Sequence, residues 1–171
     1  KTLSYPSLRN FVKIEITRLI LERFGHVDAI AGVATGAIPQ GALVADALNL
    51  PFVYVRSTPK DHGLENLIEG ELRPGMKVVV VEDLISTGGS SLKAVEAIRR
   101  DGCEVIGMVA AYTYGFPVAE KAFKDAKVPL VTLTNYEAVM EVALRTGYIE
   151  EEDVETLNEW RKDPAHWESG K

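Results

Sequence analysis

Residues 78–91 decide how this chain folds, and they read Val78-Val79-Val80-Val81-Glu82-Asp83-Leu84-Ile85-Ser86-Thr87-Gly88-Gly89-Ser90-Ser91. The four consecutive valines predict a strand that is buried on both faces, with Met76 to Val81 as its expected extent. Two adjacent acids follow the valines. A run of small and hydroxyl-bearing residues then leads into a helix that we expect to end near Arg100. Polar groups are therefore predicted where a buried strand gives way to a helix.

The run Ser86–Ser90 has the composition of a phosphate-binding turn. The first N–H groups of a helix have no partners inside it, and they lie at the positive end of the helix dipole. Glycine lets the backbone approach a phosphate closely, and Thr87 and Ser90 add hydroxyl donors. Glu82 and Asp83 are placed to accept hydrogen bonds from sugar hydroxyls. The segment thus predicts a site for a ribose 5-phosphate, and a plain strand-to-helix connection with capping residues is the alternative.

Two common glycine-rich nucleotide motifs are absent from the sequence. The chain contains neither G-x-x-x-x-G-K-[ST], which binds nucleoside triphosphates, nor G-x-G-x-x-G, which binds dinucleotides. A sugar phosphate is therefore favoured over these two ligand classes.

Helices and strands are expected to alternate along the chain, which predicts a mainly parallel, doubly wound α/β sheet in a single domain over residues 1–171. Spacing of apolar residues separates the two kinds of element, and Phe11 and Phe24 are expected in the core. The expected helices are Pro6–Phe24, Ile38–Leu48, the one that ends near Arg100, Val118–Lys124, Tyr136–Thr146 and Asp153–Lys162. The expected strands are Asp28–Val33, Pro51–Arg56, Met76–Val81, Glu104–Ala111 and Leu130–Leu133.

The predicted loops gather at one edge of this sheet. Ligands of doubly wound sheets lie beyond the carboxyl ends of the strands, and both Ala34–Ala37 and Ser86–Ser90 follow such ends. Ser57–Gly75 is a long polar segment with several Gly and Pro residues and no periodicity. A loop of this length in a compact domain is typically functional or disordered.

Composition excludes several classes of protein. The formal net charge is -6 and no dense Lys/Arg cluster occurs, so a nucleic-acid surface is not expected. Apolar runs are too short for a membrane span. Cys103 is the single cysteine, so an internal disulfide and a cysteine-based zinc site are excluded. No signal peptide is visible, and a cytoplasmic location is expected.

The segment Val78–Ser91 resembles the signature of type I phosphoribosyltransferases, which bind 5-phosphoribosyl 1-pyrophosphate (PRPP). The resemblance implies that Glu82 and Asp83 hold the ribose hydroxyls and that Asp83 is catalytic. It also implies a set of residues that bind the 5-phosphate, namely Ser86, Thr87, Gly88, Gly89 and Ser90.

Three further stretches resemble orotate phosphoribosyltransferases. The segment 56–70 is similar to their mobile catalytic loop, expected here at about 57–70. The residues that resemble their pyrophosphate loop are Ala34, Thr35, Gly36 and Ala37, followed by Ile38 and Pro39. Thr2–Pro6 resembles a stretch just after their N-terminal region. The resemblance spans the chain and implies transfer of the 5-phosphoribosyl group from PRPP to orotate, which gives orotidine 5'-monophosphate and pyrophosphate in pyrimidine (UMP) biosynthesis.

The same resemblance implies roles and partners. Arg56, Lys60 and His62 would bind PRPP, Lys60 and His62 would also be catalytic, and Ser86 would contact orotate. A homodimer with shared active sites is expected, because the family's catalytic loop reaches into the neighbouring subunit. Magnesium would arrive bound to PRPP, and no residue of the chain is assigned as a metal ligand.

The chain departs from the family pattern at four places. Many relatives have a second cation directly after the position of Arg56, where this chain has Ser57. Ser86 stands where relatives often have Thr. The stretch Tyr112–Pro117 has no Arg, whereas some relatives use one there for the orotate carboxylate. The family's N-terminal segment, which covers the base and supplies a Lys, is expected to be missing here.

Two other functions fit parts of the pattern. A purine or uracil phosphoribosyltransferase would share the PRPP signature, although purine enzymes have catalytic loops of a different build. A non-catalytic PRPP-sensing regulator would keep the fold, but such proteins often lose loop cations or gain a DNA-binding segment. An α/β interaction domain would leave the acidic pair and the glycine turn unexplained.

Overall fold

The computed structural model describes residues 1–57, 67–164 and 166–167. In chain order, the elements are the 3-10 helix η1 (Thr2–Ser4), α1 (Pro6–Arg23), β1 (Ala29–Val33), α2 (Ile38–Leu48), β2 (Phe52–Val55), β3 (Ile68–Glu69), β4 (Lys77–Ile85), α3 (Gly89–Arg100), β5 (Glu104–Thr113), α4 (Pro117–Asp125), β6 (Leu130–Asn135), α5 (Tyr136–Arg145) and α6 (Glu151–Lys162). Most predicted helices and strands are therefore found within two residues of their expected ends.

The six strands form one sheet in the order β3-β2-β1-β4-β5-β6. Pairing is parallel between β2, β1, β4 and β5, which confirms the predicted parallel α/β sheet. Strand β3 pairs with β2 in the antiparallel sense, with Val55 opposite Ile68. This short edge strand lies within the stretch that the sequence predicted as continuous loop, because two residues are too few to show a period.

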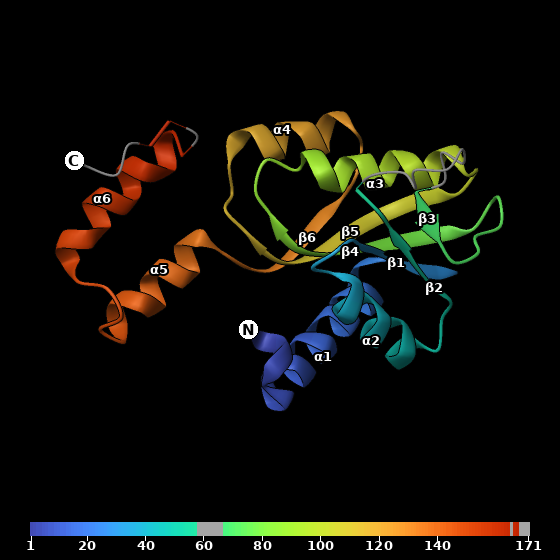
Figure 1. Ribbon diagram of the computed structural model, residues 1–171, viewed down its shortest axis with the longest axis horizontal. Helices are drawn as coiled ribbons and strands as arrows, with labels where there is room; N and C mark the ends of the chain where they lie inside the picture. Colours follow the sequence, from blue (N-terminus) through green and yellow to red (C-terminus); the bar gives the residue numbers. More distant parts are fainter. Residues whose placement is uncertain (58–66, 165, 168–171) are drawn as a thin grey trace. The chain divides into compact units, whose positions relative to one another are not determined.

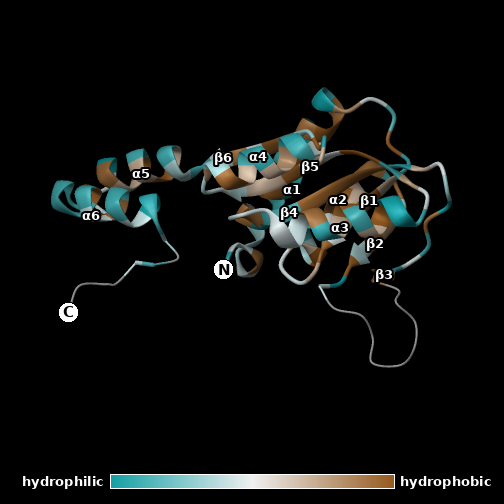
Figure 2. Cartoon of the chain, turned by 90° about the horizontal axis from the view of Figure 1, so that it is seen from above, coloured by the Kyte–Doolittle hydropathy of each residue, from teal (hydrophilic) through white to brown (hydrophobic). Residues whose placement is uncertain are grey.

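The four valines of β4 form the centre of the molecule. All four side chains are fully buried. Val78 and Val80 pack into the cluster that contains residues of α3 and α4, whereas Val79 and Val81 pack into the cluster that contains residues of α1 and α2. Figure 1 shows these two helix pairs on opposite faces of the sheet, and Figure 2 shows the apolar colour concentrated in the strands. A strand buried on both faces is thus confirmed.

Strand β4 is longer than the sequence predicted. Pairing with β5 continues past the valines, with Glu82 opposite Ala110 and Ile85 opposite Thr113. The acidic pair therefore lies within the strand, not beyond its end. Successive side chains of a strand start on opposite faces, yet the Glu82 and Asp83 carboxyl groups still interact with each other, and this interaction adds to burial in raising the pKa of Glu82.

Helix α1 packs through one face and exposes apolar side chains on another. Its buried residues are Ile16, Leu19 and Ile20. Phe24, just after the helix, is buried as predicted, but the Phe11 side chain is 60% exposed, so its predicted burial was wrong. Apolar spacing identifies the helix without showing which of two apolar faces is covered.

The contacts divide the chain into two compact units, Lys1–Thr134 and Asn135–Lys171. The first unit contains the sheet up to the end of β6. The second is a pair of helices with contacts of its own, since the Tyr136 hydroxyl donates to Leu157 O at 3.2 Å and Arg161 pairs with Glu137 at 2.6 Å. A single domain over 1–171 stays a prediction. In the described part of the chain, no helix has both the length and the apolar character to cross a bilayer.

Candidate active site at the carboxyl edge of the sheet

The turn between β4 and α3 presents free backbone donors. No described residue accepts a hydrogen bond from the N–H of Ser86, Thr87 or Gly88, and no side chain caps α3. Gly88 has φ +81, and a Cβ there would lie 2.8 Å from the Phe123 ring, so only glycine fits. Free N–H groups at a helix N-terminus can bind an anion, and the binding of a phosphate at this turn stays a prediction.

A second turn of this kind follows β1. Thr35 and Gly36 are exposed, and neither N–H has an acceptor among the residues that the structure describes. The turn is held at its two ends, where Ala34 N donates to Val55 O at 2.9 Å and Ala37 N donates to Val33 O at 3.1 Å. Successive free N–H groups in a fixed turn attract an anion.

Asp83 lies between these two turns. Its side chain lies so close to the Gly36 backbone that a Cβ on Gly36 would collide with Asp83 Oδ2. Asp83 is exposed, so its carboxylate is open to a ligand at the carboxyl edge of the sheet. The sequence did not indicate this contact, because the two residues are far apart along the chain and Gly36 looks like an ordinary turn glycine.

Glu82 lies on the opposite face of β4. Its Oε2 accepts a hydrogen bond from the Ser91 hydroxyl at 2.7 Å, and its Oε1 accepts one from Asp83 N at 3.0 Å. The residue is only 5% exposed, and burial raises the pKa of Glu82 from its ordinary value of 4.5 to about 8. Both oxygens of Glu82 are therefore engaged within the protein. The shared role of the two acids on the ribose hydroxyls, which the sequence predicts, stays a prediction.

Arg56 follows β2, next to the turn at Ala34. Its Nη1 lies 3.5 Å from Glu69 Oε1 of β3, and this buried nitrogen has no hydrogen-bond partner in the described part of the chain. The guanidinium thus lies near the sheet edge, and its Nη1 can still donate a hydrogen bond. Lys60 and His62, the other two predicted cationic residues, lie outside the described residues.

Aromatic residues lie at the end of β5 and just after it, on the other side of β4. Tyr114 N donates to Ile85 O at 3.0 Å, which fixes this segment directly beside Ser86. The Tyr112 and Tyr114 rings meet edge to face at 5.0 Å, and the Tyr114 and Phe116 rings stack at 5.3 Å. The sheet edge thus carries backbone donors and Arg56 on one side of Asp83 and an aromatic wall on the other.

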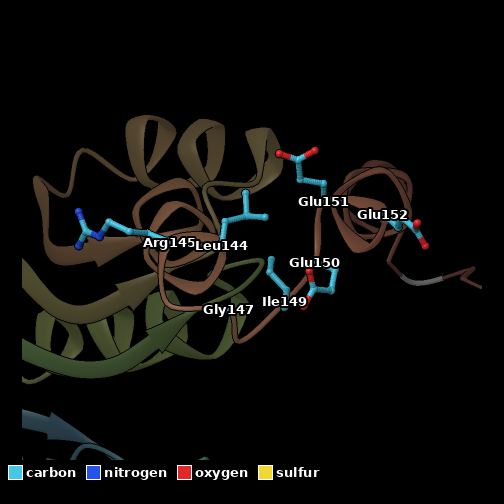
Figure 3. A pocket seen from close by; sticks show the side chains of 7 residues that line it. All are labelled: Leu144, Arg145, Gly147, Ile149, Glu150, Glu151 and Glu152. Atoms are coloured by element: carbon cyan, nitrogen blue, oxygen red, sulfur yellow. The ribbon is translucent and has the colours of Figure 1, made fainter.

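The second unit has a hollow of its own, which Figure 3 shows. It is lined by residues around the α5–α6 connection, including Arg145, Glu150, Glu151 and Glu152. These charged side chains point in different directions and do not converge on one point (Figure 3). Asp153 Oδ2 accepts from Glu150 N at 3.0 Å, so these acids belong to the start of α6. The hollow lacks the arrangement of a binding site.

Among the described residues, metal-ligating side chains do not cluster at the sheet edge. Within the described ranges, no three His, Cys, Asp or Glu side chains lie together as they would around a metal ion. Asp83 is the carboxylate of the acidic pair that is open to a ligand. This donor set fits a magnesium ion held mainly by oxygens of a phosphorylated ligand and by water.

An α/β sheet with two free-donor turns and an open acid between them has the groups that would bind a phosphorylated sugar. Residues 8–145 accordingly match the family described as the phosphoribosyl transferase domain. The solved structure of the adenine phosphoribosyltransferase from Thermoanaerobacter pseudethanolicus superimposes with a TM-score of 0.67 at 22% identity, over 79% of this chain and 84% of that one. The fold is therefore shared with an enzyme that is named for adenine.

The chain belongs to the orotate phosphoribosyltransferase family. It is 94% identical to the orotate phosphoribosyltransferase of Bacteroides fragilis over all 171 residues, which span 81% of that protein. The protein of the same name from Listeria innocua is 52% identical over 97% of this chain and 79% of its own length. The solved orotate phosphoribosyltransferase of Aeropyrum pernix has a TM-score of 0.71 and 27% identity, over 81% of this chain and 77% of that one.

Glu82 should make stability fall as the pH rises from about 4.5 to about 8. In this range the folded protein keeps a proton at Glu82 that the unfolded chain has lost, so a higher pH favours unfolding. Glu82→Gln removes the titrating group and should flatten that part of the slope. Urea unfolding at several pH values measures it. Glu104→Gln, at an exposed glutamate of β5, is the control. Equal slopes for wild type and Glu82→Gln would show that Glu82 does not hold this proton.

Proposed function

We propose that this protein transfers the 5-phosphoribosyl group from PRPP to orotate, which forms orotidine 5'-monophosphate and pyrophosphate in pyrimidine biosynthesis. The observation that carries the proposal is the pair of free-donor turns on either side of Asp83. PRPP has phosphate groups at both ends of its ribose and a diol between them. The fold does not indicate which base reacts. The choice of orotate is supported by the relatives named above.

In this proposal, each of the two turns binds one phosphate-bearing end of PRPP. The turn Ser86–Ser90 takes the 5-phosphate, because it lies at the N-terminus of α3, where dipole and free N–H groups act together. The turn Ala34–Ala37 takes the pyrophosphate, with Arg56 beside it as a planar donor. Negative charge builds on the pyrophosphate as the bond to ribose C1 breaks, and donors fixed in advance stabilise it. Lys60 and His62 are proposed to add cationic donors to this group.

The two acids have separate tasks in this proposal. Asp83, open at the sheet edge, accepts hydrogen bonds from the ribose hydroxyls and so orients C1. Glu82 acts as a positioning residue, since its bonds to Ser91 Oγ and Asp83 N tie the first turn of α3 to the strand. The sequence assigned both acids to the diol, and the extension of β4 is the reason for the revision.

The order of the strands fixes the direction of attack. Arg56 and the turn after β1 lie on one side of β4, and Tyr112 to Phe116 at the end of β5 lie on the other. A nucleophile that inverts C1 enters opposite the leaving group. With pyrophosphate on the β1–β2 side, orotate enters from the β5 side. Ser86 then contacts orotate, and the aromatic side chains form the wall of its site.

Other components are proposed on the same basis. Magnesium, carried in by PRPP, supplies positive charge to the pyrophosphate and ribose oxygens. A cytoplasmic location fits the chemistry of the substrates. A homodimer with shared active sites is proposed, and the exposed apolar side chains of α1, such as Phe11 and Leu21, offer surface for association.

The base assignment is tested by incubating the protein with PRPP, magnesium and one base at a time, while pyrophosphate release is followed. We expect release with orotate and none with uracil, adenine or hypoxanthine. Release with hypoxanthine but not with orotate would make the protein a purine enzyme.

Gly36→Ala should lower kcat/KM for PRPP on the order of a hundredfold, since misplacement of a positioning group by an ångström has such an effect. The added methyl group collides with the Asp83 carboxylate, which must then move away from the ribose. Steady-state kinetics measure the loss. Gly25→Ala is the matched control, because no atom lies within 4 Å of a Cβ there. Unchanged kinetics in Gly36→Ala would show that Asp83 does not bind the ribose diol.

Tyr114→Leu should raise KM for orotate about three- to tenfold, the value of one aromatic stacking contact, and leave KM for PRPP unchanged. Tyr148→Leu, in which the replaced side chain is 87% exposed, is the control for loss of a tyrosine. An increase in KM for PRPP alone would place the base elsewhere.

A further inference from the structure

A cavity of about 360 Å³ opens beside both anion-binding turns. Residues from four segments line it, among them Ala34, Arg56, Ser57, Ser90, Lys93 and Arg100. Its size lies within the range of pockets that hold small ligands. Because Ala34 begins the turn after β1 and Ser90 lies in the first turn of α3, a group bound at the sheet edge borders this cavity directly.

Positive charge predominates in the cavity. Arg56, Lys93 and Arg100 contribute three cations, and Glu96 contributes the one acid among the described lining residues. Glu69 already balances part of the Arg56 charge across 3.5 Å. Lys93 and Arg100 form no ion pair with any residue that the structure describes. This surplus of positive charge favours an anionic ligand.

We propose that Lys93 binds the pyrophosphate group of PRPP and stabilises it as the leaving group. This inference rests on the proposed function. Lys93 follows Ser90 by three residues, or about 4.5 Å along the helix axis, whereas Arg100 lies about 15 Å from Ser90. Long helical side chains lean toward the N-terminus, so the Lys93 side chain extends toward the start of α3, where Ser90 lines the same cavity as Ala34 and Arg56.

Ser57 explains why a cation on α3 is needed. This chain has an uncharged hydroxyl directly after Arg56. Ser57 and Lys93 line the same cavity, so a charge on either residue faces the same volume. Lys93 of α3 thus supplies the positive charge that position 57 lacks.

The test compares two inhibitors that each carry one part of PRPP. Inorganic pyrophosphate and ribose 5-phosphate are titrated against PRPP turnover in wild type, Lys93→Ala and Lys93→Ala/Ser57→Lys. In Lys93→Ala we expect the inhibition constant for pyrophosphate and KM for PRPP to rise on the order of ten- to a hundredfold, the effect of one lost charge-assisted hydrogen bond. Inhibition by ribose 5-phosphate and KM for orotate should not change. The added Ser57→Lys should restore most of the pyrophosphate affinity.

Lys121→Ala, at an exposed lysine of α4 paired with Asp125, matches the change in net charge and should behave as wild type. Weaker ribose 5-phosphate binding in Lys93→Ala, unchanged pyrophosphate inhibition, or no recovery with Ser57→Lys would each overturn the assignment. Calorimetric titration with pyrophosphate alone needs no turnover. A wild type that binds pyrophosphate but does not consume PRPP and orotate would therefore contradict the proposed function and not the role of Lys93.

Discussion

The hydrogen-bonded pairing of β4 with β5 through Ile85 is the constraint on which the site depends. It keeps Glu82 and Asp83 in extended backbone, and alternation then sends one carboxyl to Ser91 on α3 and the other to the turn at Gly36. The same pairing delivers Ser86 and Tyr114 side by side at the sheet edge. Had the strand ended at Val81, none of these placements would follow from backbone geometry.

Binding a polyanion is unexpected for a chain with a net charge of -6. The site can bind an anion through uncharged donors. The turns at Thr35–Gly36 and Ser86–Gly88 offer backbone N–H groups, so fewer lysine or arginine side chains are needed. Such donors are fixed by the fold and need little reorganisation when charge develops on a leaving group. In the proposed arrangement, cationic side chains are needed mainly at the leaving pyrophosphate, beside the cavity that Arg56 and Lys93 line.

The sequence predicted those parts of the structure that have a local signal. The valine run specified a doubly buried strand, and the glycine-rich run specified a turn with free N–H groups at the start of α3, because each depends on neighbouring residues only. The split between Glu82 and Asp83 could not be predicted, since the length of β4 is set by pairing with β5. The approach of Asp83 to Gly36 depends on two strands that are distant in sequence. Lys93 gave no signal either, because an exposed lysine on a helix is commonplace.

The buried carboxyl of Glu82 has an electrostatic consequence for the edge where substrate enters. With a pKa of about 8, the group is mostly protonated at neutral pH. The Glu82 carboxyl therefore adds little negative charge to its surroundings. A second carboxylate so close to the phosphate turn would repel an incoming anion through a medium that screens poorly. Keeping that proton lets an acid serve as a structural hydrogen-bonding group without weakening the field that attracts the substrate.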